Sequence, residues 1–248
     1  MRGRSIPISP GRRFVIDLMQ LSRGVPIVSA QRRMQLGRIV DARARCAARP
    51  MWMTIFTKAH GMLNCEFPQL RRSYIKLPWP RLYEYPHPVA AVAVERDYRG
   101  EASIFPVKIK DPGRLPLAAI DRIIRDAKSP DGEDVTRSQY WLALNARLPF
   151  LIRRPLQWMV LNTGRQRANF FGTFAVAGMS ELGVESQHII TPLSNCLSYG
   201  VIAKDGQADV RLYWDHRVMD GVVVGEALAR MEHMLNETIA DELLAQAT

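Results

Sequence analysis

The sequence has little cysteine, no long apolar run and fewer acidic than basic residues. Its three cysteines, Cys46, Cys65 and Cys196, are scattered and form no C-x-x-C pair. This spacing excludes a cysteine zinc cage and a disulfide framework, so a reduced, cytoplasmic compartment is the default expectation. We expect no metal site.

No segment is suited to crossing a membrane. The most apolar stretch, residues 148–162, is too short for a bilayer span and carries Arg153 and Arg154 in its middle. The N-terminus has no apolar segment of signal-peptide length. We therefore expect a cytoplasmic protein that is soluble or lies on the inner face of a membrane. Glycine-rich nucleotide-binding loops are also missing, which removes support for nicotinamide chemistry and nucleotide hydrolysis.

The charge is positive and unevenly placed. Lys and Arg number 34 against 24 for Asp and Glu, a net charge of +10, and residues 1–50 hold eleven arginines, two aspartates and no lysine. A positive face attracts nucleic acid, anionic lipid and phosphate-bearing cofactors. No nucleic-acid-binding motif accompanies the charge, so nucleic acid ranks last among these partners.

The 248 residues suit one large domain, 1–248. Apolar spacing and end signals predict helices over residues 10–23, 53–66 and 115–127. Extended segments are predicted over residues 27–36, 88–97, 102–111, 170–178, 188–192, 196–203 and 209–216. Helices and strands that follow one another without a regular βαβ order indicate an α+β fold.

Residues 137–168 are basic and aromatic. They contain six arginines and no acid, interleaved with bulky residues that include Trp141, Phe150, Trp158 and Met159. Two interpretations remain open: a buried helical hairpin whose arginines face water, or a surface that meets lipid headgroups or a long acyl chain.

His216 stands between a predicted strand and a predicted helix. Asp220 follows at the position of an N-cap, where its carboxylate can accept from the free amides of the first turn. The structural interpretation is therefore a strand that leads into a capped helix. The functional interpretation is an imidazole in a tight connection, which takes a proton from a thiol or hydroxyl and returns it.

Residues 215–221, "DHRVMDG", resemble the active-site signature of the acyltransferase (E2) catalytic domains of 2-oxo acid dehydrogenase complexes. The H-x-x-x-D-G core is shared with chloramphenicol acetyltransferase. The similarity extends over nearly the whole chain, through "PISPGRRFVIDLM", "FTKAHGMLNCEFPQL", the 89–111 hairpin, "GTFAVAGMSELGVES" and "TPLSNCLSYGVI". It implies a chloramphenicol acetyltransferase-like two-layer sandwich with a mixed β-sheet.

The resemblance also implies a mechanism. His216 would act as general base, so that the acceptor attacks the thioester of an acyl-coenzyme A without a covalent acyl-enzyme. Asp220 would be the second site residue, with Arg12 or Arg13 as its partner, and Asp215, Arg217 and Gly221 would support the motif. Family members are trimers with active sites at subunit interfaces, so a homotrimer or a higher assembly of trimers is implied.

The sequence departs from the family pattern in three places. The family's oxyanion-stabilising serine falls on Ala177. Three interpretations stay open: Thr173, Ser180 or a backbone amide replaces the serine, the reaction needs less oxyanion stabilisation, or the protein is a catalytically inactive trimeric scaffold or ligand-binding module. The chain begins directly with the catalytic segment, so no lipoyl group of its own is expected. A small-molecule or lipid-like acceptor is the simpler expectation, with the longer 137–168 connection shaping the acceptor pocket or contacting a membrane.

Overall fold

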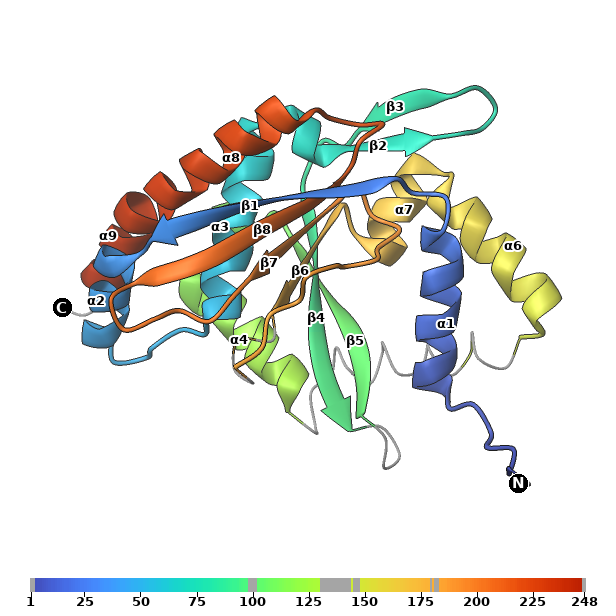
Figure 1. The fold of residues 1–248 in the computed structure, drawn as a ribbon, viewed down its shortest axis with the longest axis horizontal. Helices are drawn as coiled ribbons and strands as arrows, with labels where there is room; N and C mark the ends of the chain where they lie inside the picture. The colour runs from blue at the N-terminus through green and yellow to red at the C-terminus, as the bar shows by residue number, and fades with distance from the viewer. Residues whose placement is uncertain are drawn as a thin grey trace.

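The protein forms two layers, a mixed sheet and a set of helices (Figure 1). A computed structural model describes residues 3–97, 102–129, 144, 148–178, 180 and 183–246. The helical elements of these residues are α1 (Pro10–Ser22), α2 (Gly37–Arg45), α3 (Trp52–Glu66), α4 (Leu117–Lys128), α6 (Phe150–Leu161), α7 (Gly164–Phe171), α8 (Gly221–Met234) and α9 (Ala240–Ala245), with a π turn over Leu235–Ile239 and 3₁₀ turns at Pro68–Arg71 and Pro112–Arg114.

The main sheet has six strands in the order β1-β8-β7-β6-β4-β5. Their bounds are β1 (Ile27–Gln35), β4 (Val89–Asp97), β5 (Ala102–Lys110), β6 (Phe174–Gly178), β7 (Asn195–Tyr199) and β8 (Gln207–Asp215). β6 runs parallel to β4 and β7, and the other pairs are antiparallel. A separate hairpin joins β2 (Arg72–Ile75) to β3 (Arg81–Glu84). The α+β class and the mixed sheet are thus confirmed.

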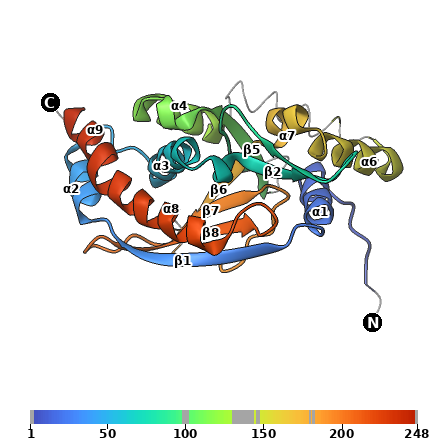
Figure 2. The same cartoon turned by 90° about the horizontal axis from the view of Figure 1, so that it is seen from above.

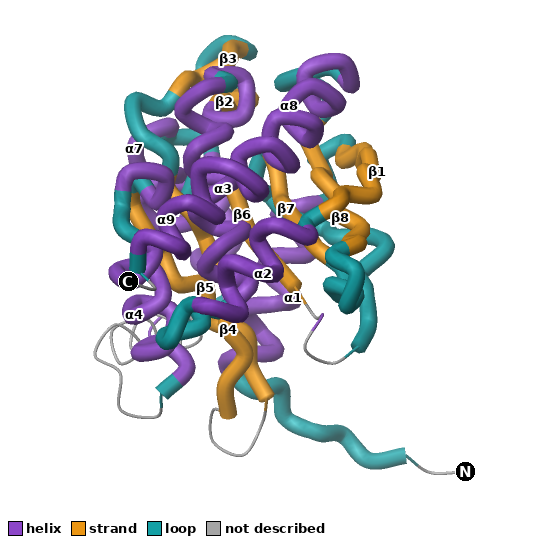
Figure 3. The backbone as a smooth tube through the Cα atoms, turned by 90° about the vertical axis from the view of Figure 1, so that its left-hand side faces the viewer, coloured by secondary structure: helices purple, strands orange, loops and turns teal. Residues whose placement is uncertain are grey.

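The core lies between the sheet and the helix layer, which Figures 2 and 3 show from two further sides. α3 crosses the middle of the sheet and buries Ile55, Phe56 and Leu63 completely. The Phe56 ring stacks on Tyr199 of β7 with centroids 4.3 Å apart. The opposite face of the sheet is covered by the segment before β7, because Arg211 binds the Glu185 carboxylate at 2.9 Å and the Tyr213 hydroxyl donates to the Ser186 carbonyl at 2.8 Å.

Most of the predicted elements are confirmed. α1 begins after Ser9, whose hydroxyl accepts from the Arg12 amide at 3.1 Å, and it has proline at its first position. β8 is confirmed as a strand and places Val210, Leu212 and Trp214 in the core. Arg211 and Tyr213 on its opposite face are buried as well, so the strand is buried on both faces.

Three strand predictions are wrong in part or whole. The segment predicted over 196–203 forms a strand only up to Tyr199, where β7 ends. Residues 170 and 171 end α7, and β6 begins only after Gly172, whose φ of +88° separates helix from strand. Residues 188–192 form no strand.

The described part of the 137–168 segment is residue 144 and residues 148–168, and Trp141 lies outside it. The interpretation in which arginines face water holds only in part, because Arg165 is exposed and the Arg154 side chain is 40% exposed. Arg153 and Arg167 are buried. The apolar face of α6 is exposed instead, through Phe150, Leu151, Ile152, Leu156, Trp158 and Met159.

An ion pair between α1 and α6 explains this orientation of α6. The Arg153 guanidinium donates to both carboxylate oxygens of Asp17, at 2.5 and 3.1 Å, and also to the Leu148 carbonyl at 2.8 Å. Both side chains are almost fully buried, with 6% and 3% exposed. A buried charge is stable only beside its partner, so this pair fixes which face of α6 turns inward.

Asp17→Ala should lower the free energy of unfolding by about 3 to 5 kcal/mol, because it leaves the Arg153 guanidinium buried and unneutralised. Urea denaturation measures the change. As a control, Asp126→Ala removes an exposed i,i+4 pair with Arg122 and should change the free energy by no more than about 0.5 kcal/mol. Equal effects of the two substitutions would contradict the role of the Asp17–Arg153 pair.

His60 of α3 should make stability depend on pH. Its ring is fully buried against Phe174 and shares a hydrogen bond of 2.7 Å with the Asn195 side chain. Burial lowers the pKa of His60 to about 4. Because this lies below the ~6.5 of an unfolded histidine, the contribution of the neutral ring is complete above pH ~6.5 and is lost as the pH falls toward 4, by about 3 kcal/mol.

The measurement is the free energy of unfolding at several values between pH 6.5 and 4, in the native protein and in His60→Gln. The variant should lose less stability over this range, by about the same ~3 kcal/mol, since its side chain does not titrate. Parallel curves for the two proteins would show that His60 is not buried as a neutral ring.

Candidate functional site

The site is a tight turn at the end of β8, and backbone hydrogen bonds hold it on several sides. The Asp215 amide donates to the Ser194 carbonyl at 2.8 Å, and the His216 amide donates to the Pro26 carbonyl at 3.2 Å. The Trp214 indole donates to the Met219 carbonyl at 3.0 Å. The turn is therefore fixed by β8, by the segment before β7 and by the connection between α1 and β1.

A buried carboxylate organises the turn from inside. Asp215 is 1% exposed. Its oxygens accept from the Arg217 amide at 3.0 Å and from the Arg217 guanidinium at 2.9 and 2.8 Å. The guanidinium also lies over the Tyr74 ring, 4.4 Å from its centroid. These contacts hold the Arg217 side chain against the turn. They are the interactions by which Asp215 and Arg217 would support the motif.

His216 points away from this ion pair. Half of its side chain is exposed, and core residues do not enclose it. Its Nδ1 lies 3.7 Å from an Asp220 carboxylate oxygen, a distance too long for a direct hydrogen bond. In the described part of the chain Nε2 makes no hydrogen bond, so this nitrogen is free to exchange a proton with a bound group.

Asp220 occupies the expected N-cap position of α8 but does not cap the helix with its side chain. That part of the prediction is wrong, because the 85% exposed carboxylate turns toward His216. Within one chain the Asp220 carboxylate lies beside His216, and its pairing with Arg12 or Arg13 stays a prediction. Gly221 begins α8, and a Cβ there would meet no atom within 4 Å.

Of the predicted oxyanion residues, Thr173 and Ala177 do not reach the imidazole within one chain. The Thr173 hydroxyl is already used by β4, since it accepts from the Val89 amide at 2.9 Å and lies 3.2 Å from the Val89 carbonyl. Ala177 is in register with Ser198, which pairs with Arg211. Arg211 precedes His216 by five residues on β8, or about 16 Å at ~3.3 Å per residue.

Several supporting residues lie beyond what the sequence could indicate. Tyr74 supports Arg217 from the β2–β3 hairpin, and Ser194 receives the Asp215 amide. Arg167, which is also buried, donates to the Pro192 carbonyl at 2.7 Å. No motif marks these residues, because Tyr74 and Ser194 contact the turn from segments distant in sequence, and Arg167 supports the segment before Ser194.

Other histidines and cysteines are ordinary, as expected. His188 is exposed, and burial raises the pKa of the Cys196 thiol to about 12, which makes it a poor nucleophile. Within residues 3–246, apart from the undescribed gaps, no three His, Cys, Asp or Glu side chains gather as metal ligands would. Over the same residues, every helix is too short or too polar to cross a bilayer.

No protein-family profile and no curated protein sequence matches the chain. Solved structures do resemble it. A probable dihydrolipoamide acetyltransferase from Listeria monocytogenes is 18% identical with a TM-score of 0.66, and 95% of each chain is covered. A dihydrolipoamide acetyltransferase from Azotobacter vinelandii is 14% identical with a TM-score of 0.70, over 98% of this chain and 95% of that one.

A chloramphenicol acetyltransferase is 14% identical with a TM-score of 0.52, over 94% of this chain and 99% of that one. The chain therefore has the chloramphenicol acetyltransferase-like fold of E2 catalytic domains, as the sequence resemblance predicts. For the Azotobacter enzyme, the roles of a serine, a histidine and an asparagine four residues after that histidine were investigated in the catalytic mechanism. His216 and Asp220 have the same separation.

Arg217→Gln should lower the free energy of unfolding by about 1 to 3 kcal/mol, because the buried Asp215 carboxylate loses its guanidinium. Chemical denaturation gives the stability, and amide exchange of residues 215–219 reports the loosened turn. Asp220→Asn, at an exposed position, should change stability by no more than about 0.5 kcal/mol. A stable Arg217→Gln protein with unchanged amide exchange would rule out the proposed support of the turn.

Proposed function

We propose that this chain is an acyltransferase that moves an acyl group from acyl-coenzyme A to a small-molecule or lipid-like acceptor, with His216 as general base. The observation that carries the proposal is a half-exposed imidazole on a backbone held from several sides, with Nε2 open. A general base needs this combination, since it must contact the substrate and hold its position. The fold shared with acetyltransferases supports the same class of reaction.

The proposed reaction is a direct transfer between two substrates. His216 Nε2 takes the proton of the acceptor's thiol or hydroxyl, and the resulting nucleophile attacks the thioester carbonyl carbon. The tetrahedral intermediate then expels the coenzyme A thiolate, which receives the proton back from the imidazolium. No bond forms between the acyl group and the protein. A positioned base of this kind contributes roughly 10² to 10⁴ in rate.

The residues around His216 have positioning roles in this scheme. Asp215 and Arg217 fix the backbone of the turn through their buried pair. Asp220 places a carboxylate oxygen 3.7 Å from Nδ1, the ring nitrogen that does not take the proton in this scheme. Coenzyme A carries several phosphates, and the net charge of +10 favours its approach.

A homotrimer fits the geometry better than an isolated chain. His216 is open on one side, and Ala177 lies far from it along the sheet. A second copy that places a donor opposite His216 would complete the oxyanion site, as heterologous contacts do in a closed ring. One of the structures with this fold is the cubic core of a pyruvate dehydrogenase multienzyme complex, which is 14% identical.

Ala177 favours one alternative, a non-catalytic scaffold or ligand-binding module of the same fold. The family's serine hydroxyl is missing at this position, and losing one oxyanion donor costs about 10² to 10³ in turnover. The scaffold predicts no thiol release with any pair of acyl-coenzyme A and acceptor. The intact His216 turn supports the enzyme.

The experiment measures release of free coenzyme A from a panel of acyl donors, with and without thiol and hydroxyl acceptors. His216→Ala should lower turnover by about 10² to 10⁴ while the protein keeps its fold. His188→Ala, which alters an exposed histidine outside the site, should leave turnover unchanged. Activity that survives in His216→Ala would remove this residue from the mechanism.

A further inference from the structure

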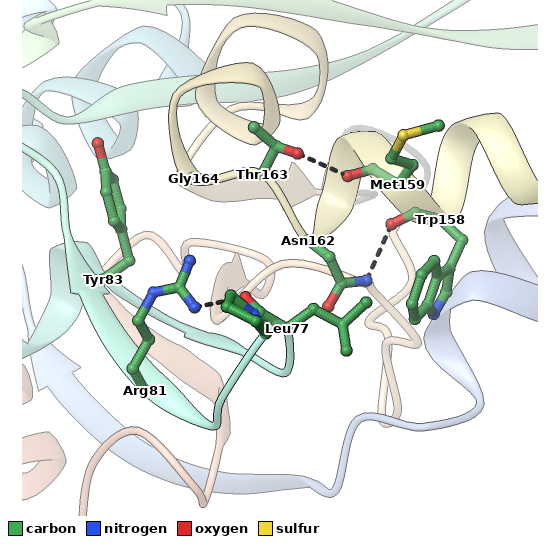
Figure 4. Close-up of a pocket in the computed structure, with 9 residues that line it drawn as sticks. Leu77, Arg81, Tyr83, Trp158, Met159, Asn162, Thr163 and Gly164 are labelled. Carbon is green, nitrogen blue, oxygen red and sulfur yellow. Dashed lines mark hydrogen bonds between the residues drawn. The ribbon is translucent and has the colours of Figure 1, made fainter.

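A cavity of about 590 Å³ lies between the β2–β3 hairpin and the α6–α7 pair (Figure 4). Leu77, Arg81 and Tyr83 line it from the hairpin, and Trp158 and Met159 line it from α6. Its volume lies within the range of small-molecule sites, which is about 300 to 1,000 Å³. His216 is not among the lining residues.

The hairpin separates this cavity from the His216 turn. Side chains alternate along a strand, and directly paired residues share a face. Tyr83 pairs with Ser73, whereas Tyr74 pairs with Leu82. Tyr83 therefore faces the cavity from one side of the hairpin, and Tyr74 contacts Arg217 from the other.

The cavity walls are mainly apolar and remain open to solvent. Leu77 is 45% exposed, Trp158 44% and Met159 56%. Gly164 allows the Tyr83 ring to lie close to α7, since a Cβ there would be 2.7 Å from the ring. Exposed apolar groups gathered around a hollow indicate a binding site when a few polar groups join them.

The polar side chains of the cavity differ in whether their hydrogen bonds and charge are already satisfied. Asn162 donates to the Trp158 carbonyl at 2.9 Å, and Thr163 donates to the Met159 carbonyl at 3.0 Å, so both are satisfied locally. Among the residues that the structure describes, Arg81 donates only to the Leu77 and Trp79 carbonyls, which carry no charge.

No carboxylate neutralises Arg81 within the described residues. Glu84 on the same strand is already bound by Arg71 at 3.1 Å and by Arg72 at 2.9 Å. The lining residues include no Asp or Glu. The cavity thus combines apolar walls with one unpaired guanidinium.

We propose that this cavity binds an amphiphilic anion, a straight hydrocarbon chain that ends in a carboxylate or phosphate. The chain lies along Leu77, Tyr83, Trp158 and Met159, and the anionic head pairs with Arg81. A single guanidinium among apolar walls suits one anionic group, whereas a polyphosphate needs several cations. This binding is independent of the proposed transfer reaction.

Calorimetric titration with dodecanoate, kept below its micelle concentration, tests the proposal directly. Affinity should rise about fourfold for each methylene added from octanoate to dodecanoate, as expected when each CH₂ is buried. Dodecanol, which has the same chain without the charge, should bind about fivefold more weakly. Affinity that does not depend on chain length would overturn the proposal.

Two substitutions test the geometry. Arg81→Gln should weaken dodecanoate binding about fivefold and leave dodecanol binding unchanged. Met159→Glu, at a half-exposed position, places a charge in the apolar wall that the hydrocarbon chain contacts and should weaken dodecanoate binding at least tenfold. Leu151→Glu is the matched control, because Leu151 is 71% exposed on α6 but does not line the cavity. It should bind dodecanoate normally.

Two results would overturn the proposal in favour of another mode of binding. If Leu151→Glu weakened binding as much as Met159→Glu, dodecanoate would be adsorbing to the exposed face of α6. If vesicles containing phosphatidylglycerol bound the protein while monomeric dodecanoate did not, the surface would be a membrane contact and not a single-chain site.

Discussion

The burial of the Asp215 carboxylate constrains the rest of the site. A buried charge at the end of β8 must be paired, and Arg217 supplies the pair from only two residues away. This short connection forces a tight turn and draws the guanidinium inward against Tyr74. The residue between them, His216, is left on the outer side with half its ring exposed. The same interaction that satisfies the strand end therefore presents the imidazole.

A second buried pair shapes the surface beside the hairpin. Asp17 holds Arg153 inward, so α6 packs on α1 through a polar contact and turns bulky apolar residues outward. The cavity beneath the β2–β3 hairpin is a consequence, since its α6 wall is part of that exposed face. The two pairs thus create two distinct features, and the hairpin lies between them. The physical principle is the same in both, because a charge that must be neutralised decides which neighbouring side chains face solvent.

The sequence predicted much of the fold and part of the site. Apolar spacing and end signals located α1, α3 and α8, and the H-x-x-x-D-G motif located the turn. The orientation of α6 could not be predicted, because it depends on a contact of Arg153 with a residue 136 positions away. The strands of the β2–β3 hairpin have four residues each, RSYI and RLYE, and their apolar residues do not alternate with polar ones. The predicted capping contact of the Asp220 side chain is wrong, because a carboxylate at an N-cap position can also turn toward a neighbouring histidine.

In the proposed enzyme, His216 projects into a site where the thiol of coenzyme A meets the acceptor, and a second copy of the chain completes this site. The most direct measurement is a crystal structure of the protein with coenzyme A bound. We expect the coenzyme A sulfur to lie within hydrogen-bonding reach of His216 Nε2, directly or through one water, at a boundary between two copies. Coenzyme A bound elsewhere, or a monomer with His216 facing only solvent, would contradict it.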